Sequence, residues 1–552
     1  MRMVDLRSDT VTEMQNIKKY KKPFLIIIIS IIVLTLFINP YYYHAYAGYA
    51  ESSIQLLQKK IDYIWIIIAA SMVFFMQVGF TAFEAGSVQA KNAISVSIKN
   101  ILNFLVSSIA YFIVGFGLMF GLSYEGYTGI NNFLLIGIDV HPNTLGYAFV
   151  FFQLVFASTA ATIISGAFAE RAKLLTHICT TIFVVCVIYP VFGHWAWGHL
   201  FYFNQHGWLG KLGFIDFAGS TVVHSISGWV ALAGAIVLGP RIGKFNSDGT
   251  VNRMHGHNLP LATLGTFFLW FGWFGFNGGS LLRADTSIGL VIINTTLSGA
   301  VAGVAVAIFG KLRNKGLDAA DILLGIMGGL VAIGAGCSRV SSVYACIVGL
   351  FAGIIAMIAK DFIEKILKVD DPVGAVPIHG FCGVWGTLAV GLFTPVSEFS
   401  VTNSNRLLQI GVQCIGIIVA FAWAFPLGLL FFWCLKKLVG IRVSTEEETK
   451  GLNISEYTDV TSWLDFVKIT KVQDMNSALQ DRIKGRTREL EYIKKNLEED
   501  VRKRTSELEE SRDAFKKKVE QLEGFERVAI GRELKMKKME QELKNFKNPN
   551  QK

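Results

Sequence analysis

The feature that most constrains this chain is a series of long apolar segments separated by short polar stretches. An α-helix needs about 20 residues to cross a bilayer, and eleven segments approach or exceed that length. They cover about residues 62–85, 101–122, 147–168, 175–197, 217–239, 258–281, 287–310, 319–336, 340–363, 373–393 and 407–438. Because lipid offers no partners to backbone polar groups, such segments must be helical. The sequence predicts an all-α polytopic membrane protein with eleven transmembrane helices.

Composition and charge placement agree with this prediction. The 552 residues are 52% hydrophobic and include 53 glycines, which is typical of closely packed membrane helices. The formal net charge of +10 does not indicate nucleic-acid binding, because most basic residues lie in the short loops and the C-terminal tail. The positive-inside rule places the mature N-terminus outside and the C-terminus in the cytoplasm, across the cytoplasmic (inner) membrane.

Neither a metal nor a cofactor is expected. The seven cysteines lie within or at the ends of apolar segments, without a CxxC spacing, and are interpreted as small core residues. His194, His199 and His206, near the outer end of the fourth segment, leave a shallow external metal site as a minor alternative.

The N-terminal region has the pattern of a signal peptide. KKYKK at 18–22 precedes an apolar run at 24–38, and AYA at 45–47 offers a small-residue cleavage site. Residues 1–47 are therefore predicted to be removed after Ala47, with translation from Met14 as an alternative start. An uncleaved first membrane helix is the competing interpretation, although the apolar run is short for a span.

Two pairs of motifs indicate an internal repeat. DFAGSTVVH at 216–224 has a counterpart in DPVGAVPIH at 371–379, and GFTAFEAGS at 79–87 aligns with GWFGFNGGS at 272–280. Segments one to five and six to ten thus look like two copies of one unit. Each copy has an odd number of spans, so the second is inverted, which gives a 5+5 inverted repeat plus one helix. Such repeats place a substrate path at their interface.

The repeated motif carries ionisable groups that are expensive in lipid and should face protein or water. Asp216 has two compatible interpretations. It is a helix cap, a support for a nearby cation, or both. His224 alone would read as an ordinary core histidine, but the inverted repeat brings it together with His379. Two neutral imidazoles are able to share one proton between them. A metal is the alternative, although zinc usually takes three or four protein ligands.

Aromatic clusters lie close to these polar residues in the sequence. They are FFQLVFA at 151–157, HWAWG at 194–198 and LWFGWFGFNGGS at 269–280. Such clusters usually serve packing or the membrane interface. Beside Asp216 and the histidines, however, their π faces would suit a small monovalent cation, and a ring such as Phe276 is able to block a narrow pore.

These motifs together resemble the ammonium transporters of the Amt/Rh family. DFAGSTVVH, DDPVGAVPIHG, the FFQxxFA run, GAFAER, HNLP and GWFGFNGGS occur in the family's order from about residue 60 to 453. The resemblance implies that residues 48–440 form an Amt-type membrane domain that assembles as a homotrimer, with one pore in each protomer. It also implies a transporter of ammonium or ammonia in the lipid bilayer, not an enzyme.

The resemblance assigns an external recruitment site for ammonium. Phe156, Trp197 and Ser280 match the binding positions, and Asp216 matches the acidic residue that supports the cation from behind. The alignment at Trp197 is the least secure, because the following outer loop looks longer than in bacterial relatives.

The resemblance also assigns the path below that site. Phe156 and Phe276 match two stacked gating rings, and His224 with His379 match the twin-histidine pair that relays a proton. Ammonium would lose a proton there and cross an apolar lumen as ammonia.

The C-terminal region departs from the family. A polar juxtamembrane segment, 441–473, precedes a stretch at 474–546 rich in Glu, Lys, Arg and Leu, and 547–552 is expected to be a disordered end. Apolar residues follow a helical seam with heptad character at positions 490, 497, 501, 508, 515, 519 and 522. This predicts a cytoplasmic coiled coil of undefined strand number.

The tail leaves two functions open. GLNISEYTDV retains only part of the motif that docks a PII-type regulator. Control of this protein by such a regulator is therefore in doubt. LEEDVRKRTSELEE resembles the linkers of bacterial sensor kinases and cyclases, yet no histidine follows His379, so the chain is not itself a histidine kinase. It is either a transporter with a scaffold tail or an ammonium sensor that contacts a cytoplasmic signalling protein.

Overall fold

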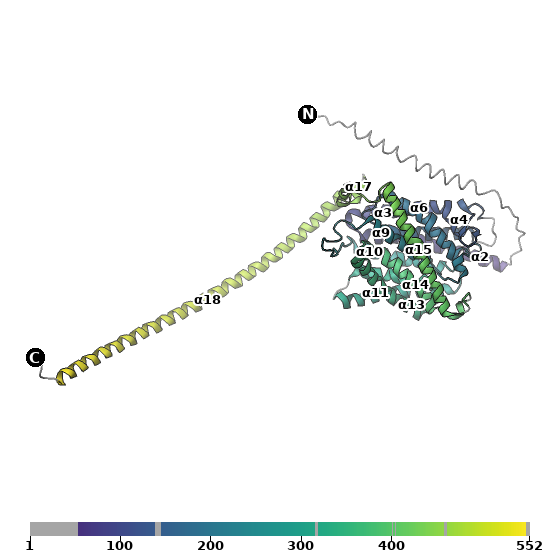
Figure 1. The fold of residues 1–552 in the computed structure, drawn as a ribbon. Helices are drawn as coiled ribbons and strands as arrows, with labels where there is room; N and C mark the ends of the chain where they lie inside the picture. Colours follow the sequence, from purple (N-terminus) through teal and green to yellow (C-terminus); the bar gives the residue numbers. More distant parts are fainter. Residues whose placement is uncertain are drawn as a thin grey trace, which may run out of the picture. The chain divides into compact units, whose positions relative to one another are not determined.

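The computed structural model describes residues 53–138, 145–314, 318–399, 401–402, 404–457 and 461–547. The predicted signal peptide, residues 1–47, lies outside these ranges. The chain divides between Thr458 and Asp459 into two compact units. Figure 1 shows the first unit as a bundle of packed helices and the second as one long helix.

The elements of the first unit are almost all helical, with one short antiparallel hairpin. In chain order they are α2 (Ser53–Ser87), η1 (Ala90–Asn92), α3 (Ala93–Ala110), η2 (Tyr111–Gly115), α4 (Phe116–Phe120), β1 (Ser123–Tyr124), β2 (Thr128–Gly129), η3 (Phe133–Leu135), α5 (Gly146–Ala167), α6 (Leu174–Phe183), η5 (Val184–Ile188), α7 (Tyr189–Trp197), α8 (Trp208–Lys211), η6 (Ser220–Ser225), α9 (Ile226–Leu238), α10 (Leu259–Gly279), α11 (Ser287–Asn314), α12 (Ala319–Ile333), α13 (Ser342–Asp361), η7 (Phe362–Ile366), η8 (Val376–Phe381), α14 (Cys382–Phe393), η9 (Val396–Glu398), α15 (Arg406–Leu438), α16 (Thr445–Lys450) and α17 (Leu452–Glu456).

The predicted polytopic membrane fold is confirmed. Ten helical stretches in the described part of the chain are long and apolar enough to cross a membrane. The eighth predicted span corresponds to α12, an apolar helix of 15 residues that packs between α11 and α13. At about 1.5 Å per residue it is shorter than the hydrocarbon layer.

The first two helices start earlier than their apolar composition predicts. α2 begins at Ser53 instead of about residue 62, and the second helical stretch begins at Ala90 instead of about 101. Some polar residues in these additional turns bond to distant parts of the chain. The Lys99 Nζ atom donates to the backbone oxygen of Ala172 and to Glu456, both at 3.0 Å. A prediction based on the length of apolar segments does not find helical turns whose polar side chains bond to distant parts of the protein.

The first and sixth spans, α2 and α10, pack face to face through glycines. A Cβ on Gly86 would lie 2.5 Å from the backbone nitrogen of Ala262, and one on Gly265 would lie 2.3 Å from that of Phe83. Helices approach this closely only where a side chain is missing on the contact face. These two helices carry the pair of glycine-containing motifs that aligned in the sequence, so corresponding spans of the two copies meet in the bundle.

A buried ionic cluster ties together several helix ends and the segment that contains α17. Arg241 bonds to Asp370 through its Nε and Nη2 atoms, both at 2.8 Å, and also forms an ion pair with Glu170. Burial raises the pKa of Asp370, but the bonds and charge of Arg241 outweigh it and hold that pKa well below its usual range. Glu170 accepts in turn from the Asn92 side chain, and Asn92 accepts from the backbone N–H of Leu452.

The second unit is the helix α18 (Thr461–Lys547), 87 residues long. It starts ahead of the coil predicted at 474–546 and continues through it without interruption. Apolar side chains spaced by seven residues are solvent-exposed along it, among them Val501, Leu508, Phe515 and Leu522. An isolated helix gains little stability from such a face, so the seam is suited to packing against further helices.

Candidate functional site

The site is built from two matching helix N-termini. In the first, Gly219 adopts a left-handed φ of +109° just before η6, which continues into α9. The Asp216 carboxylate sits before this turn and accepts four backbone N–H groups, those of Gly219, Ser220, Thr221 and Val222, at 2.8 to 2.9 Å. Asp216 is therefore a helix cap that satisfies donors with no partner inside the helix.

The second helix N-terminus repeats this arrangement. Gly374 has a φ of +74°, again three residues after an aspartate, and η8 follows it. The Asp371 carboxylate accepts the N–H groups of Ala375 at 3.1 Å and Val376 at 2.7 Å. The shared spacing of DFAGSTVVH and DPVGAVPIH thus has one structural cause: an aspartate cap, a left-handed glycine and a histidine one turn into a π-helical start.

Close backbone contact brings the two histidines together. A Cβ on Gly228 would lie 2.3 Å from the backbone nitrogen of Gly380, and one on Gly383 would lie 2.3 Å from the carbonyl oxygen of Ser220. The helices therefore cross almost without side chains between them.

The two imidazoles meet at this crossing. The Nδ1 atoms of His224 and His379 are 3.1 Å apart, and both residues are buried. Two nitrogens at this distance form one hydrogen bond, in which one ring donates and the other accepts. The prediction that the repeat unites these residues agrees with the geometry.

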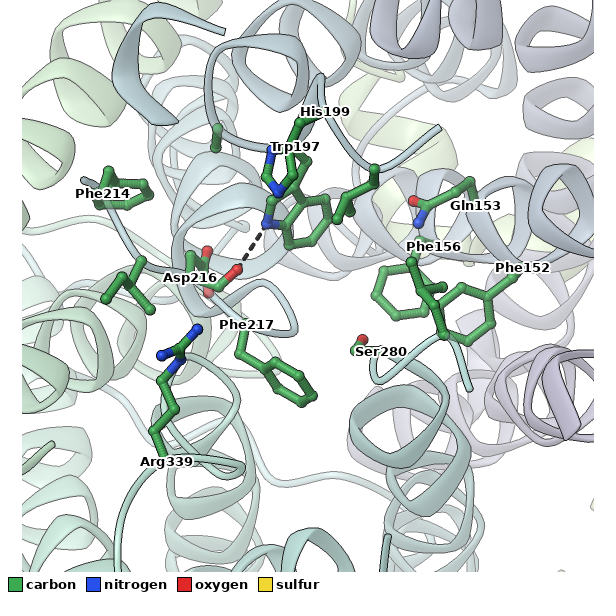
Figure 2. Close-up of a pocket in the computed structure, with 14 residues that line it drawn as sticks. Phe152, Gln153, Phe156, Trp197, His199, Phe214, Asp216, Phe217, Ser280 and Arg339 are labelled. Atoms are coloured by element: carbon green, nitrogen blue, oxygen red, sulfur yellow. Dashed lines mark hydrogen bonds between the residues drawn. The ribbon is translucent and has the colours of Figure 1, made fainter. Parts of the chain in front are cut away.

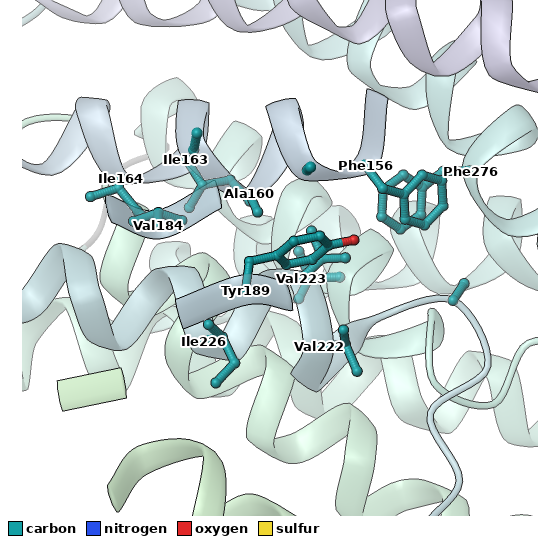
Figure 3. Packing of buried hydrophobic residues seen from close by; sticks show 14 of the residues in the cluster. Phe156, Ala160, Ile163, Ile164, Val184, Tyr189, Val222, Val223, Ile226 and Phe276 are labelled. Carbon is teal, nitrogen blue, oxygen red and sulfur yellow. The ribbon is translucent and has the colours of Figure 1, made fainter. Parts of the chain in front are cut away.

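Aromatic rings cover the histidine pair on one side. The Trp273 ring stacks on His224 with centroids 5.5 Å apart, and the Phe276 ring lies 5.4 Å away. Phe276 and Phe156 are stacked face to face at 3.9 Å and 9° (Figure 3). The rings thus form a continuous column that leads from Phe156 to the imidazoles.

A cavity of about 200 Å³ lies at the other end of this column (Figure 2). The Trp197 indole nitrogen donates to the backbone oxygen of Asp216 at 2.7 Å, which fixes its ring in the wall, 6.4 Å from the ring of Phe156. The Ser280 hydroxyl donates to the backbone oxygen of Phe276 at 2.8 Å, so its oxygen is able to accept from a ligand. The lining residues are Phe152, Gln153, Phe156, Ala196, Trp197, His199, Leu200, Phe214, Ile215, Asp216, Phe217, Ser280, Leu282 and Arg339.

Three ionisable side chains belong to this lining. Burial raises the pKa of Asp216, and its four N–H donors offset part of that rise. Burial, with a smaller contribution from His206, lowers the pKa of His199 to about 4, so this ring is neutral at physiological pH. Arg339 is a third group and bonds to Glu398 at 2.9 Å.

The three outer histidines do not converge on one point. The His194 nitrogens are 2.8 Å from the Met119 backbone oxygen and 2.8 Å from the Ser123 hydroxyl, while His199 and His206 stack on each other at 4.7 Å. Within the described ranges no group of three or more His, Cys, Asp or Glu side chains is arranged to hold a metal ion. The geometry offers no support for the alternative of an external metal site.

The residues assigned to the recruitment site, the gate and the histidine pair lie in this column and cavity: Phe156, Trp197, Asp216, His224, Phe276, Ser280 and His379. Sequence reasoning missed Phe152 and Trp273, although both belong to the aromatic motifs that were singled out. It also missed the place of His199 and Arg339 in the cavity wall. Both come from connecting segments, where no motif or periodicity predicts the direction of a side chain.

Comparisons with known proteins agree with the geometry. The profile of the Ammonium Transporter Family matches residues 64–462. The ammonium transporter Amt2 of Archaeoglobus fulgidus is 41% identical over 74% of this chain and 90% of its own length. Ammonium transporter 1 member 1 of Arabidopsis thaliana is 34% identical over 68% of this chain and 79% of its own.

Solved structures show the same relationship. A structure named Sensor Amt Protein has 55% identity and a TM-score of 0.72 over 73% of this chain and all of its own. Mep2 of Candida albicans has 28% identity and a TM-score of 0.64 over 70% of this chain and 87% of its own. Members of the matched family are transporters and not enzymes. The chain therefore belongs to the ammonium transporter family.

Proposed function

We propose that the chain moves ammonium through each protomer by recruitment in the outer cavity, deprotonation, and passage of ammonia and a proton past His224 and His379. One observation carries the proposal: the cavity, the Phe156–Phe276 stack and the histidine pair follow one another along the same column. This order provides a place for a cation, a barrier and a proton acceptor in succession.

Recruitment would use π faces and one acceptor. Ammonium is almost entirely protonated at neutral pH, and the faces of Trp197 and Phe156 attract a cation electrostatically. The Ser280 oxygen provides a hydrogen-bond acceptor beside them. The Asp216 carboxylate stays bonded to four N–H groups and would act by its charge from behind the wall.

Passage would require the loss of a proton. The stacked rings and the apolar surroundings penalise a bare cation, because neither replaces its hydration. Ammonium is able to escape that penalty by deprotonation, which potassium cannot do. The hydrogen-bonded imidazole pair is able to carry the released proton separately, so the net result is transport of positive charge. Selectivity would then depend on acidity as well as on size.

The proposal includes a homotrimer with external mature N-termini and cytoplasmic tails, in the cytoplasmic membrane. Control by a PII-type regulator is not included, since GLNISEYTDV keeps only part of the docking motif. The segment is instead bonded to the chain's own helices: Asn453 accepts from the backbone N–H of Ser95 at 3.0 Å, and Glu456 accepts from the Ser95 hydroxyl at 2.6 Å.

A second function is favoured by α18. An ammonium sensor would use the same cavity and histidines but transmit occupancy to a cytoplasmic signalling protein through a coil of several copies of α18. The exposed seam of this helix and the likeness to the structure named Sensor Amt Protein support this alternative.

The two functions differ in conduction. Reconstituted full-length protein and a chain that ends before α18 are compared by the current after an ammonium concentration step. Saturable currents in both forms support transport with a scaffold tail. Saturable ammonium binding without current in either form supports the sensor.

A further inference from the structure

The outer cavity contains a feature that a cation site would not be expected to have. Arg339 lies in its wall, and its guanidinium points into the space between Asp216 and Phe217 (Figure 2). A fixed positive charge opposes the entry of another cation. The guanidinium therefore either holds the surrounding loops in place or changes the affinity of the cavity for ammonium.

Among the described residues, Arg339 has one ion-pair partner. Arg339 lies between α12 and α13, whereas its partner Glu398 lies in η9, and the two side chains are 2.9 Å apart. They are 33% and 51% exposed, respectively, so the pair is only partly buried. Exposed pairs of this kind contribute little to stability. The contact is therefore weak evidence for a purely structural role.

Two other ionisable groups belong to the wall. The Asp216 carboxylate accepts four neutral backbone N–H groups, which do not remove the negative charge that the proposed function places behind the wall. His199 is neutral at physiological pH, because burial lowers its pKa to about 4. Arg339 adds a positive charge to this wall, and Glu398 offsets it, so this pair changes the charge that a recruited cation meets.

We propose that Arg339 and Glu398 together set the affinity of the recruitment cavity for ammonium, with Arg339 lowering it and Glu398 restoring it. This inference rests on the proposed function of the cavity. The effect is electrostatic and acts through partly hydrated space, where a unit charge about 10 Å away changes a cation's affinity by roughly two- to tenfold. Dissolved salt screens it, since the Debye length is about 10 Å at 0.1 M.

The charge hypothesis predicts opposite effects for the two partners. Arg339→Gln removes the repulsion and should lower the half-saturating ammonium concentration, whereas Glu398→Gln exposes the repulsion and should raise it. The double variant removes both charges of the pair and should lie between the two single variants, close to the wild type. Arg339→Lys keeps the charge and should resemble the wild type. A structural tether between the two loops would instead make both single variants defective in the same direction.

The experiment uses full-length protein in liposomes and measures current against ammonium chloride concentration, in low salt and in 0.5 M sodium chloride (about 4 Å Debye length). Arg253→Gln is the matched control. This arginine is 72% exposed, is paired with Asp318 at 3.9 Å, and belongs to a connecting segment that does not line the cavity. The control should leave half-saturation close to that of the wild type.

The proposal is supported by a roughly two- to tenfold lower half-saturation for Arg339→Gln, a rise for Glu398→Gln, and differences that shrink at high salt. It is overturned if the wild type responds to ammonium while Arg339→Gln is unchanged or weaker. A wild type that neither binds ammonium nor gives an ammonium-dependent current overturns the proposed function, and this inference with it.

Discussion

Gly228 and Gly380 are in backbone contact: a Cβ on Gly228 would lie 2.3 Å from the Gly380 nitrogen. The histidine-bearing helices therefore cross with no side chain between them at this point. The 3.1 Å contact between the imidazoles depends on that crossing. A methyl group at the crossing is the smallest change that should separate the pair.

Gly228→Ala is expected to lower the ammonium current at least about tenfold, because a shift of about 1 Å in reacting groups commonly costs more than that. Overpacking should also cost about 1–3 kcal/mol of stability. Ammonium-step currents and thermal unfolding of the purified protein test both effects. Gly289→Ala is the control, since a Cβ there has nothing within 4 Å. Equal currents in the two variants would show that the crossing does not position the histidines.

Asp370→Asn should destabilise the first unit by about 3 kcal/mol, because it leaves Arg241 buried without its main counter-charge. The low pKa of Asp370 makes the effect depend on pH. The stability that the Asp370 carboxylate contributes is fully present above the ordinary carboxyl pKa of about 4. It is lost as the pH falls through the lowered pKa of Asp370 in the folded protein.

The gap in unfolding temperature between wild type and Asp370→Asn should therefore be constant from pH 6 to 8 and narrow below about pH 4. Glu489→Gln is the comparison variant, because its ion pair with Arg486 is exposed and should contribute almost nothing. A gap that widens under acidic conditions would mean that Asp370 is not stabilised as an anion.

Residues 461–552 expressed alone should form a multi-stranded coil whose unfolding temperature rises with protein concentration. Leu508→Asn with Phe515→Asn removes two exposed seam residues and should abolish that dependence and most of the helicity. Circular dichroism at several concentrations measures both. Asp513→Asn with Glu520→Gln, on the opposite face, is the matched control. A helix that is equally stable at every concentration would count against self-association.

The sequence predicted those parts of the fold that depend on apolar length and motif repetition. Ten of the eleven predicted spans meet the length of a membrane helix in the structure, because uninterrupted apolar runs permit little else in lipid. The pairing of His224 with His379 also followed from the inverted repeat. The extra turns of α2 and α3 were not predicted, because some of their polar residues bond to partners far away in the chain, such as Glu456 for Lys99.

The composition of the outer cavity was only partly predictable. Phe156, Trp197 and Ser280 belong to recognisable motifs, whereas Arg339 comes from a connecting segment whose path is set by tertiary packing. Its contact with Glu398 joins two loops that no local pattern relates. Trp273 lay within a motif, but only the helix geometry shows that it stacks on His224.

The central claim is that the imidazole pair carries the proton released from ammonium. It is tested most directly by currents from liposomes that contain His224→Ala, measured on an ammonium step beside the wild type, with equal protein incorporation and intact thermal unfolding as controls. Removing one imidazole leaves His379 without the partner 3.1 Å away. The account predicts that the saturable current is lost, or that its dependence on ammonium is altered. A current in His224→Ala that matches the wild type in size and half-saturation would contradict it.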